Sequence, residues 1–171
     1  MLLALSTIQL VTSKEKLVKR LSDLGFLFVL VAAVEAIYAL TAILTPPGQI
    51  EAVTGWVLSA DGKWLVKLLG LALASQAWVA WTLRNQPHRG VAKALALYQL
   101  GSATADWVMW IVLADQNVFS TTLGQVLVMI SIPTHYALGF LLVRAIRRAS
   151  APQADGSRSG AFRPAIPNPH L

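Results

Sequence analysis

The chain has 171 residues, of which 56% are hydrophobic and only 13% charged, whereas soluble domains carry about 25% charged residues. This balance excludes an ordinary soluble domain, and the net charge of +6 does not indicate nucleic-acid binding because most basic residues lie between apolar segments. The absence of cysteine excludes disulfides, thiolate metal sites, iron–sulfur clusters and cysteine nucleophiles.

Residues 1–20 form an N-terminal arm. Its apolar part, residues 1–13, is too short to cross a bilayer, and its basic residues follow the apolar part instead of preceding it. A secretory signal peptide has the opposite order, so we expect no cleaved signal. An interfacial helix or a loose arm fits this stretch better.

Four apolar segments follow, and each is about long enough to cross a bilayer about 30 Å thick. They cover residues 21–44, 63–83, 93–114 and 122–143. Residues 21–143 are therefore predicted to form one transmembrane domain, an all-α four-helix bundle. Pro133 lies inside the fourth segment and is expected to bend it, because proline removes one backbone hydrogen bond.

The loop between the first two segments, residues 45–62, is longer than a simple turn and partly apolar. It either folds over the mouth of the bundle as a lid or lies at the membrane interface, anchored by Trp56. Residues 144–171 begin with arginines and continue with proline, serine, glycine and alanine, a composition typical of a disordered tail.

The basic residues predict the orientation. Twelve of the 14 Lys and Arg residues lie before the first segment, between the second and third, or after the fourth, which places them on one side. Because cytosolic loops carry this excess, both termini should be cytosolic. We expect an integral, multi-pass protein of the endoplasmic reticulum or another endomembrane.

Several polar residues interrupt the apolar segments. A charged side chain at membrane depth costs several kcal/mol, at least about 2.5, and usually marks function. Asp106 lies near the middle of the third segment, and Gln99, Ser102 and Trp110 share its helical face. Glu35 and Tyr38 share a face of the first segment, and Ser131 and His135 share a face of the fourth.

Counting residues inward from the cytosolic ends, at about 1.5 Å per residue, places Glu35 and Asp106 at nearly the same depth. We therefore expect one cavity inside the bundle. The predicted catalytic residues around it are Asp106, Glu35, His135 and Tyr38. The predicted substrate-binding residues are Gln99, Ser102, Trp107, Trp110 and Ser131. One histidine and two carboxylates on three helices lack a local ligand motif, so we expect neither a metal nor another cofactor.

Two carboxylates close together in a low dielectric do not both ionise, so such a pair offers an acid beside a base. This combination suits epoxide opening, double-bond isomerisation or proton-triggered cyclisation of an apolar substrate. In this interpretation Asp106 activates water or acts as a nucleophile, Glu35 supplies the proton, and His135 orients a carboxylate or relays protons.

Structural interpretations of the same residues stay open. Glu35 and Asp106 fit a structural pair between two helices, and His135 fits a donor to the carbonyl that Pro133 leaves free. The tyrosine and tryptophans fit packing or interface anchors. A non-enzymatic lipid or sterol binder, a small transporter or an assembly factor is the alternative class.

In the size and hydropathy of its four segments, and in Glu35, Asp106 and His135, the chain resembles the small membrane-bound epoxide hydrolases and cyclases of fungal polyketide and meroterpenoid pathways. The resemblance implies a hydrolase or cyclase of secondary metabolism, a lipophilic small-molecule substrate, a surrounding of membrane lipid, and pathway enzymes as partners. The chain also resembles sterol-isomerase-like four-span domains, which use intramembrane carboxylates and aromatic walls. It is less similar to the anthrone-oxygenase-like small membrane proteins.

Overall fold

Helices are present in all four apolar segments. The computed structural model describes residues 23–113, 115 and 118–150, so the expectations for the N-terminal arm and for residues 151–171 lie outside the described residues. Within the described part the chain is all-helical, without strands. Its α-helices are α2 (Leu24–Leu44), α3 (Pro47–Thr54), α4 (Ala60–Leu83), α5 (Arg89–Val112) and α6 (Thr122–Ser150).

Local sequence signals set several helix ends. The Asp23 side chain accepts a hydrogen bond from the Gly25 backbone N–H at 2.8 Å and caps the start of α2. Ser59 caps α4 in the same way, through Gly62 at 3.1 Å. The tail prediction was wrong for residues 144–150, because α6 continues to Ser150. Hydropathy falls where the arginines begin, but arginine is a good helix former, so the helix continues past that boundary.

Three of the described helices, α2, α4 and α6, are long and apolar enough to cross a membrane. They identify the chain as a membrane protein by the length and composition of its helices. Helix α5 is as long as α4, at 24 residues, but it is not among the three. Its lower hydropathy comes from the polar residues that it carries.

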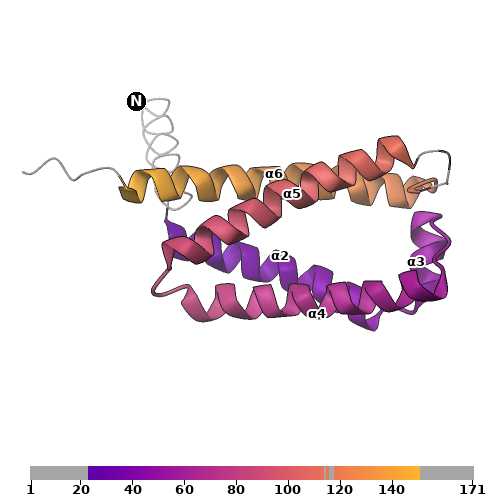
Figure 1. The fold of residues 1–171 in the computed structure, drawn as a ribbon, viewed down its shortest axis with the longest axis horizontal. Coiled ribbons are helices and arrows are strands. Elements are labelled where there is room, and N and C mark those ends of the chain that lie inside the picture. Colours follow the sequence, from indigo (N-terminus) through magenta and orange to yellow (C-terminus); the bar gives the residue numbers. More distant parts are fainter. Residues whose placement is uncertain (1–22, 114, 116–117, 151–171) are drawn as a thin grey trace, which may run out of the picture.

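The long helices form two antiparallel pairs, α2 with α4 and α5 with α6 (Figure 1). Glycines allow close approach within each pair. A Cβ added to Gly70 on α4 would lie 2.7 Å from Ile43 Cγ1 on α2, and a Cβ on Gly139 of α6 would lie 2.6 Å from Leu100 Cγ on α5. Because real Cβ atoms essentially never approach so closely, a larger residue at either position would push the paired helices apart.

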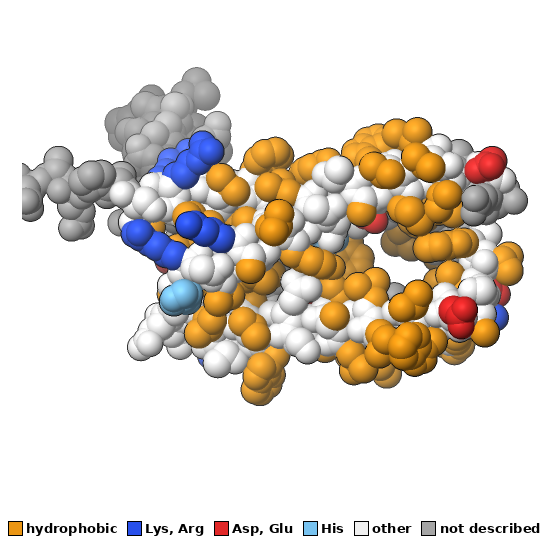
Figure 2. All heavy atoms as spheres, viewed as in Figure 1, with side chains coloured by type: hydrophobic (Ala, Val, Ile, Leu, Met, Phe, Trp, Pro, Cys, Tyr) orange, Lys and Arg blue, Asp and Glu red, His pale blue; other side chains and the backbone are white. Residues whose placement is uncertain are grey.

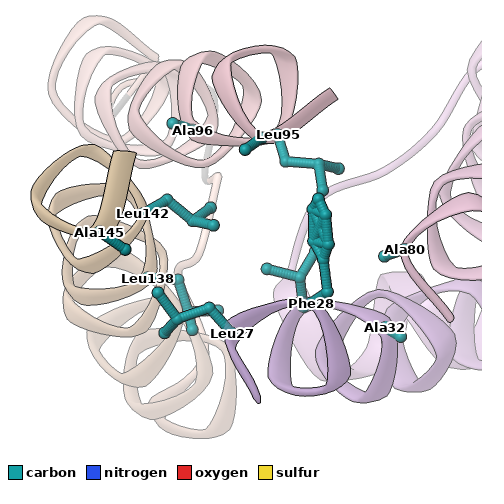
Figure 3. Close-up of a cluster of buried hydrophobic side chains, with 11 residues drawn as sticks. Leu27, Phe28, Ala32, Ala80, Leu95, Ala96, Leu138, Leu142 and Ala145 are labelled. Carbon is teal, nitrogen blue, oxygen red and sulfur yellow. The ribbon is translucent and has the colours of Figure 1, made fainter. Parts of the chain in front are cut away.

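The main hydrophobic core joins the two pairs at the end of the bundle where α4 turns into α5. It contains side chains from all four long helices, including Leu27, Phe28, Leu95, Leu138 and Leu142 (Figure 3). Toward α3 the smaller core cluster, Ala103, Val128 and Ile132, comes from α5 and α6 alone. The two pairs therefore separate toward α3, and Figure 2 shows the molecule hollowed between them in that half.

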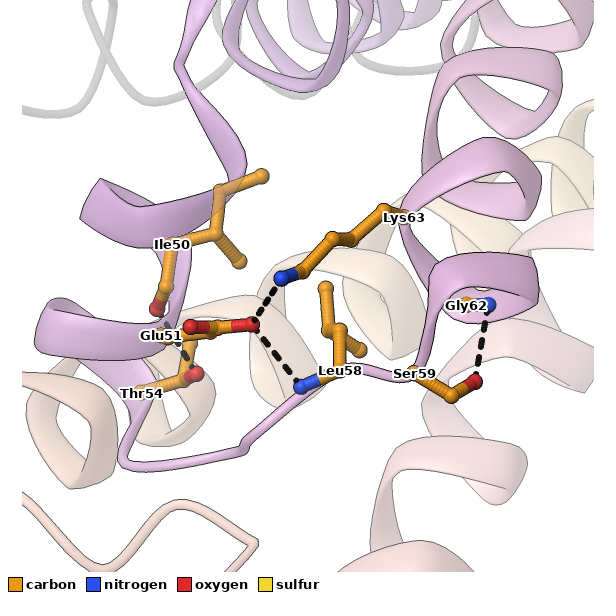
Figure 4. A network of polar contacts seen from close by, with 7 residues as sticks. All are labelled: Ile50, Glu51, Thr54, Leu58, Ser59, Gly62 and Lys63. Atoms are coloured by element: carbon orange, nitrogen blue, oxygen red, sulfur yellow. Dashed lines mark hydrogen bonds and ion pairs between the residues drawn. The ribbon is translucent and has the colours of Figure 1, made fainter.

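Helix α3 lies in the predicted long loop and closes the open end of the bundle. The Thr121 hydroxyl, at the start of α6, donates a hydrogen bond to the Val53 carbonyl of α3. On the other side, the Glu51 carboxylate accepts from the Leu58 backbone N–H at 3.1 Å and forms an ion pair with Lys63 at 3.2 Å (Figure 4). Contacts of α3 to both α4 and α6 fit a lid better than a segment that only rests on the membrane surface.

Candidate functional site

Three buried polar side chains lie one helical turn beyond the main core, on the side that faces the hollow. Glu35 on α2, Gln99 on α5 and His135 on α6 are 0%, 0% and 5% exposed. Each lies three positions from a residue of the main core on its own helix. Glu35 follows Ala32, Gln99 follows Ala96, and His135 precedes Leu138. Since residues three apart share a helical face, the same faces that build the core carry the polar groups into the interior.

The three side chains form a continuous hydrogen-bonded chain. Gln99 Nε2 donates to Glu35 Oε1 at 2.5 Å, and Gln99 Oε1 lies 2.5 Å from His135 Nδ1. An amide oxygen can only accept, so His135 Nδ1 carries the proton of this bond. In the neutral imidazole the other nitrogen, Nε2, is then a proton acceptor, and no described residue hydrogen-bonds to it.

Glu35 also has a free atom. Its Oε2 is buried and has no hydrogen-bond partner among the described residues. Leaving a buried polar atom unpaired costs about 1–3 kcal/mol, so such atoms are uncommon in native interiors. Within the described part of the chain, Oε2 is therefore left without the partner that a buried carboxyl oxygen normally has.

Two tyrosines flank the imidazole. The Tyr38 ring stacks on His135 with centroids 5.3 Å apart, and the Tyr98 ring meets it edge-on at 6.5 Å. Tyr38 was predicted to belong to the site, whereas Tyr98 was not. The signal for Tyr98 was its spacing of three and four residues from Leu95 and Ser102 on α5, which places it on their face.

Asp106 belongs to a second, separate polar group. The Ser131 hydroxyl donates to Asp106 Oδ2 at 3.3 Å, and both side chains are half-buried. Asp106 lies seven residues beyond Gln99, about 10 Å further along α5. The expected direct pairing of Glu35 with Asp106 is absent from the described hydrogen bonds, since each carboxylate has a different partner.

The helix starts explain this difference. With α2 beginning at Leu24 and α5 at Arg89, Glu35 is eleven residues into its helix, Gln99 ten and Asp106 seventeen. The depth comparison from hydropathy used residue 21 and residue 93 as starting points. The two assumed starts were wrong by three and four residues in opposite directions, which adds up to seven residues or about 10 Å. With the observed starts, Glu35 lies at the depth of Gln99 and not at the depth of Asp106.

The remaining predicted residues lie closer to α3. Ser102 is half-buried between Gln99 and Asp106 on α5. Trp110 packs against the α5–α6 cluster, and its ring stacks on Trp107 with centroids 5.7 Å apart. Trp107 is 40% exposed, so it covers Trp110 on the outside instead of lining the interior.

Two of the cavities in the described structure lie along the long helices. One, of about 430 Å³, is a furrow between α2 and α4 lined mainly by alanines with Trp78 and Trp81, and it contains none of the predicted site residues. The other, of about 460 Å³, lies between α4 and α5 and reaches Tyr98. Among the described residues no cluster of three His, Cys, Asp or Glu side chains is arranged to hold a metal ion.

The fold and the site together define a helical membrane protein with an acid–amide–imidazole chain buried between its helix pairs. No protein-family model, curated protein or solved structure matches the chain. Its residues and their geometry are therefore the basis for the functional proposal.

Proposed function

We propose that the protein is a membrane-embedded acid–base enzyme that acts on a lipophilic molecule, with epoxide hydrolysis or epoxide-opening cyclisation as its reaction. One observation supports this most strongly: the buried chain of Glu35, Gln99 and His135 leaves two free proton-transfer atoms, Glu35 Oε2 and His135 Nε2. An acid and a base held beside one hollow are the groups that epoxide opening requires.

In the proposed reaction Glu35 donates a proton from Oε2 to the epoxide oxygen as a ring C–O bond breaks. Water, or a hydroxyl of the substrate in a cyclisation, forms the new C–O bond and gives its proton to His135 Nε2. The proton on His135 Nε2 then returns to Glu35 Oε2 through water in the hollow, which restores both groups, while the Gln99 hydrogen bonds hold the two side chains in position. No cofactor enters this scheme.

This assignment makes His135 the base in place of Asp106. A catalytic acid and base must reach the reacting group within hydrogen-bond distance or through one water. His135 is linked to Glu35 through a single side chain, whereas Asp106 lies about 10 Å beyond Gln99 along α5. In this proposal Asp106 and Ser131, which are hydrogen-bonded to each other, instead bind a polar group of the substrate in the half of the hollow nearer α3.

The proposal includes a four-span topology. The end of α4 and the start of α6 lie at opposite ends of the bundle (Figure 1). If α4 and α6 cross the bilayer, α5 must cross it as well, and 24 residues span about 36 Å. The basic residues then favour cytosolic termini and, with the resemblance to biosynthetic enzymes, an endomembrane location.

The test is conversion of a lipophilic alkyl epoxide to its diol by membranes that contain matched amounts of each variant. Glu35→Gln and His135→Gln should each lower turnover about 10²-fold or more, the usual scale of acid–base catalysis. The double variant should be little worse than either single variant, since residues that act together fail together. Ser131→Ala should cost much less. Full turnover in both single variants would contradict the proposal.

A second candidate is a non-catalytic lipid or sterol binder, which the furrow between α2 and α4 favours. Six alanines form its surface, and Trp78 and Trp81 border it, so a flat or linear apolar molecule fits against it. A binder of this kind would keep its ligand in the Glu35→Gln variant and lose it when Ala36→Phe fills the furrow. An enzyme of the proposed class should instead lose turnover in Glu35→Gln and keep it in Ala36→Phe.

A further inference from the structure

The gap between α4 and α5 is an unusual feature of the bundle. The two helices are consecutive in the chain and are joined by a short turn, yet they share almost no contacts, because each pairs with another helix. A cavity of about 460 Å³ lies between them. Its lining residues come from both helices: Ser75, Gln76, Val79, Val91, Ala94, Leu95 and Tyr98.

This cavity extends from the membrane-facing surface to the edge of the site. At its outer side Val79 is 41% exposed and Ala94 is exposed. At its inner side Leu95 belongs to the main core and Tyr98 contacts His135 with the edge of its ring. One aromatic side chain therefore separates a cavity that opens to lipid from the imidazole of the site.

Gln76 places an unpaired amide in this cavity. The side chain is half-buried, and no described residue forms a hydrogen bond with it. It lies seven residues from the end of α4, about 10 Å into the helix and within the hydrocarbon region. A polar group at that depth needs a partner, and an amide both donates and accepts.

We propose that the α4–α5 cavity is the lateral entrance and remote binding subsite for the substrate, a bilayer-dissolved lipophile that carries a carbonyl or hydroxyl group. Gln76 binds that polar group, and Tyr98 moves aside to admit the reactive end toward His135. This inference rests on the proposed function for the identity of the reaction, but the binding step is measurable without turnover.

The binding test uses a lipophilic epoxide that carries a ketone and a photoreactive diazirine, with the full chain in phospholipid vesicles. Cross-links are mapped by mass spectrometry in the wild-type chain and in His135→Gln. They should fall on the residues that line the α4–α5 cavity in both proteins, and an excess of the unlabelled ketone should suppress them. Cross-links confined to Trp78 and Trp81, or insensitive to the competitor, would overturn the subsite.

Two substitutions refine the assignment. Gln76→Leu keeps the side-chain size and should weaken competition by the ketone about tenfold, as expected for loss of one buried hydrogen bond, while a competitor without the carbonyl is unaffected. Ala94→Trp should block the entrance. Leu97→Trp, at a 74% exposed position of the same helix outside the cavity, is its matched control. Equal competition in Gln76→Leu and the wild type would overturn the role of Gln76.

The outcomes separate the two proposals. Cross-linking in the cavity without conversion of any epoxide would retain the subsite and contradict the proposed reaction. Conversion that depends on His135, together with cross-links that avoid the cavity, would retain the reaction and overturn the lateral entrance.

Discussion

Gln99 on α5 donates a hydrogen bond to Glu35 on α2 at a distance of 2.5 Å, and both side chains are completely buried. This bond connects the two helix pairs at the level where their shared hydrophobic core ends. Through its oxygen the same amide also contacts His135 on α6. One side chain thus holds the relative positions of three helices and of both proposed proton-transfer groups.

Replacing Gln99 with Leu should therefore destabilise the protein. Leucine has about the same volume as glutamine, but it leaves the Glu35 carboxyl and the His135 imidazole without their hydrogen-bond partner. Each unpaired group should cost about 1–3 kcal/mol. Denaturant unfolding in mixed micelles, followed by circular dichroism, measures the loss. The triple variant with Leu at positions 35, 99 and 135 should recover part of the stability, because it removes all three polar groups together. A triple variant less stable than Gln99→Leu would contradict this account.

The glycines of the α5–α6 pair give a matched comparison. Gly139→Ala places a Cβ 2.6 Å from Leu100 Cγ and 3.3 Å from the Leu100 backbone nitrogen, so it should force α5 and α6 apart. Overpacking of this kind typically costs about 1–3 kcal/mol. Gly101→Ala meets no atom within 4 Å and should be neutral or stabilising by up to about 1 kcal/mol through helix propensity. Thermal unfolding of both variants in one detergent is the measurement, and equal shifts would show that the α5–α6 contact is not tight.

Much of the fold could be predicted because membrane helices follow simple rules. Long apolar runs predicted α2, α4 and α6. Helix α3 was not predicted as a helix, since its eight residues carry no clear apolar periodicity. The last turns of α6 were also missed, because hydropathy reports where lipid contact ends and not where the helix ends.

The site was predicted in part. Exposing a polar side chain to lipid is costly, so Glu35 and His135 were expected to face the interior of the bundle, and both are buried there. Helical spacing predicted that Tyr38 shares the face of Glu35, and its ring stacks on His135. The partner of Glu35 could not be identified, because the pairing of polar residues depends on where each helix starts to within a turn. A short polar turn, residues 84–88, hides the start of α5 at Arg89 from any hydropathy criterion.

Both termini of the chain should lie on the same, cytosolic side of the membrane. The start of α2 and the end of α6 lie at one end of the bundle (Figure 1), and basic residues gather at that end. Epitope tags placed at residue 1 and after residue 171 should both be accessible to antibody on the cytosolic face of sealed vesicles. A tag inserted after Gly55, next to α3, serves as the control and should be protected. Tags on opposite sides would require an odd number of spans and would contradict the four-span topology.

Lys67 should contribute more to stability than its position in an apolar helix suggests. Its ammonium group donates hydrogen bonds to the carbonyls of Ala42, Ile43 and Thr45 at 2.9, 2.9 and 2.7 Å. These carbonyls lie at the C-terminal end of α2, where backbone oxygens lack helical partners and a positive charge is favourable.

Lys67→Met keeps most of the aliphatic length of the side chain but leaves those carbonyls unpaired, so it should cost about 1–3 kcal/mol and accelerate amide exchange in the last turn of α2. Lys63→Met is the control on the same helix, because Lys63 is 43% exposed and its ion pair with Glu51 should contribute only about 0.2–1 kcal/mol. Hydrogen–deuterium exchange in nanodiscs, read over residues 38–45, separates the two variants. If both lysine variants exchange at the wild-type rate there, the Lys67 ammonium does not hold the end of α2.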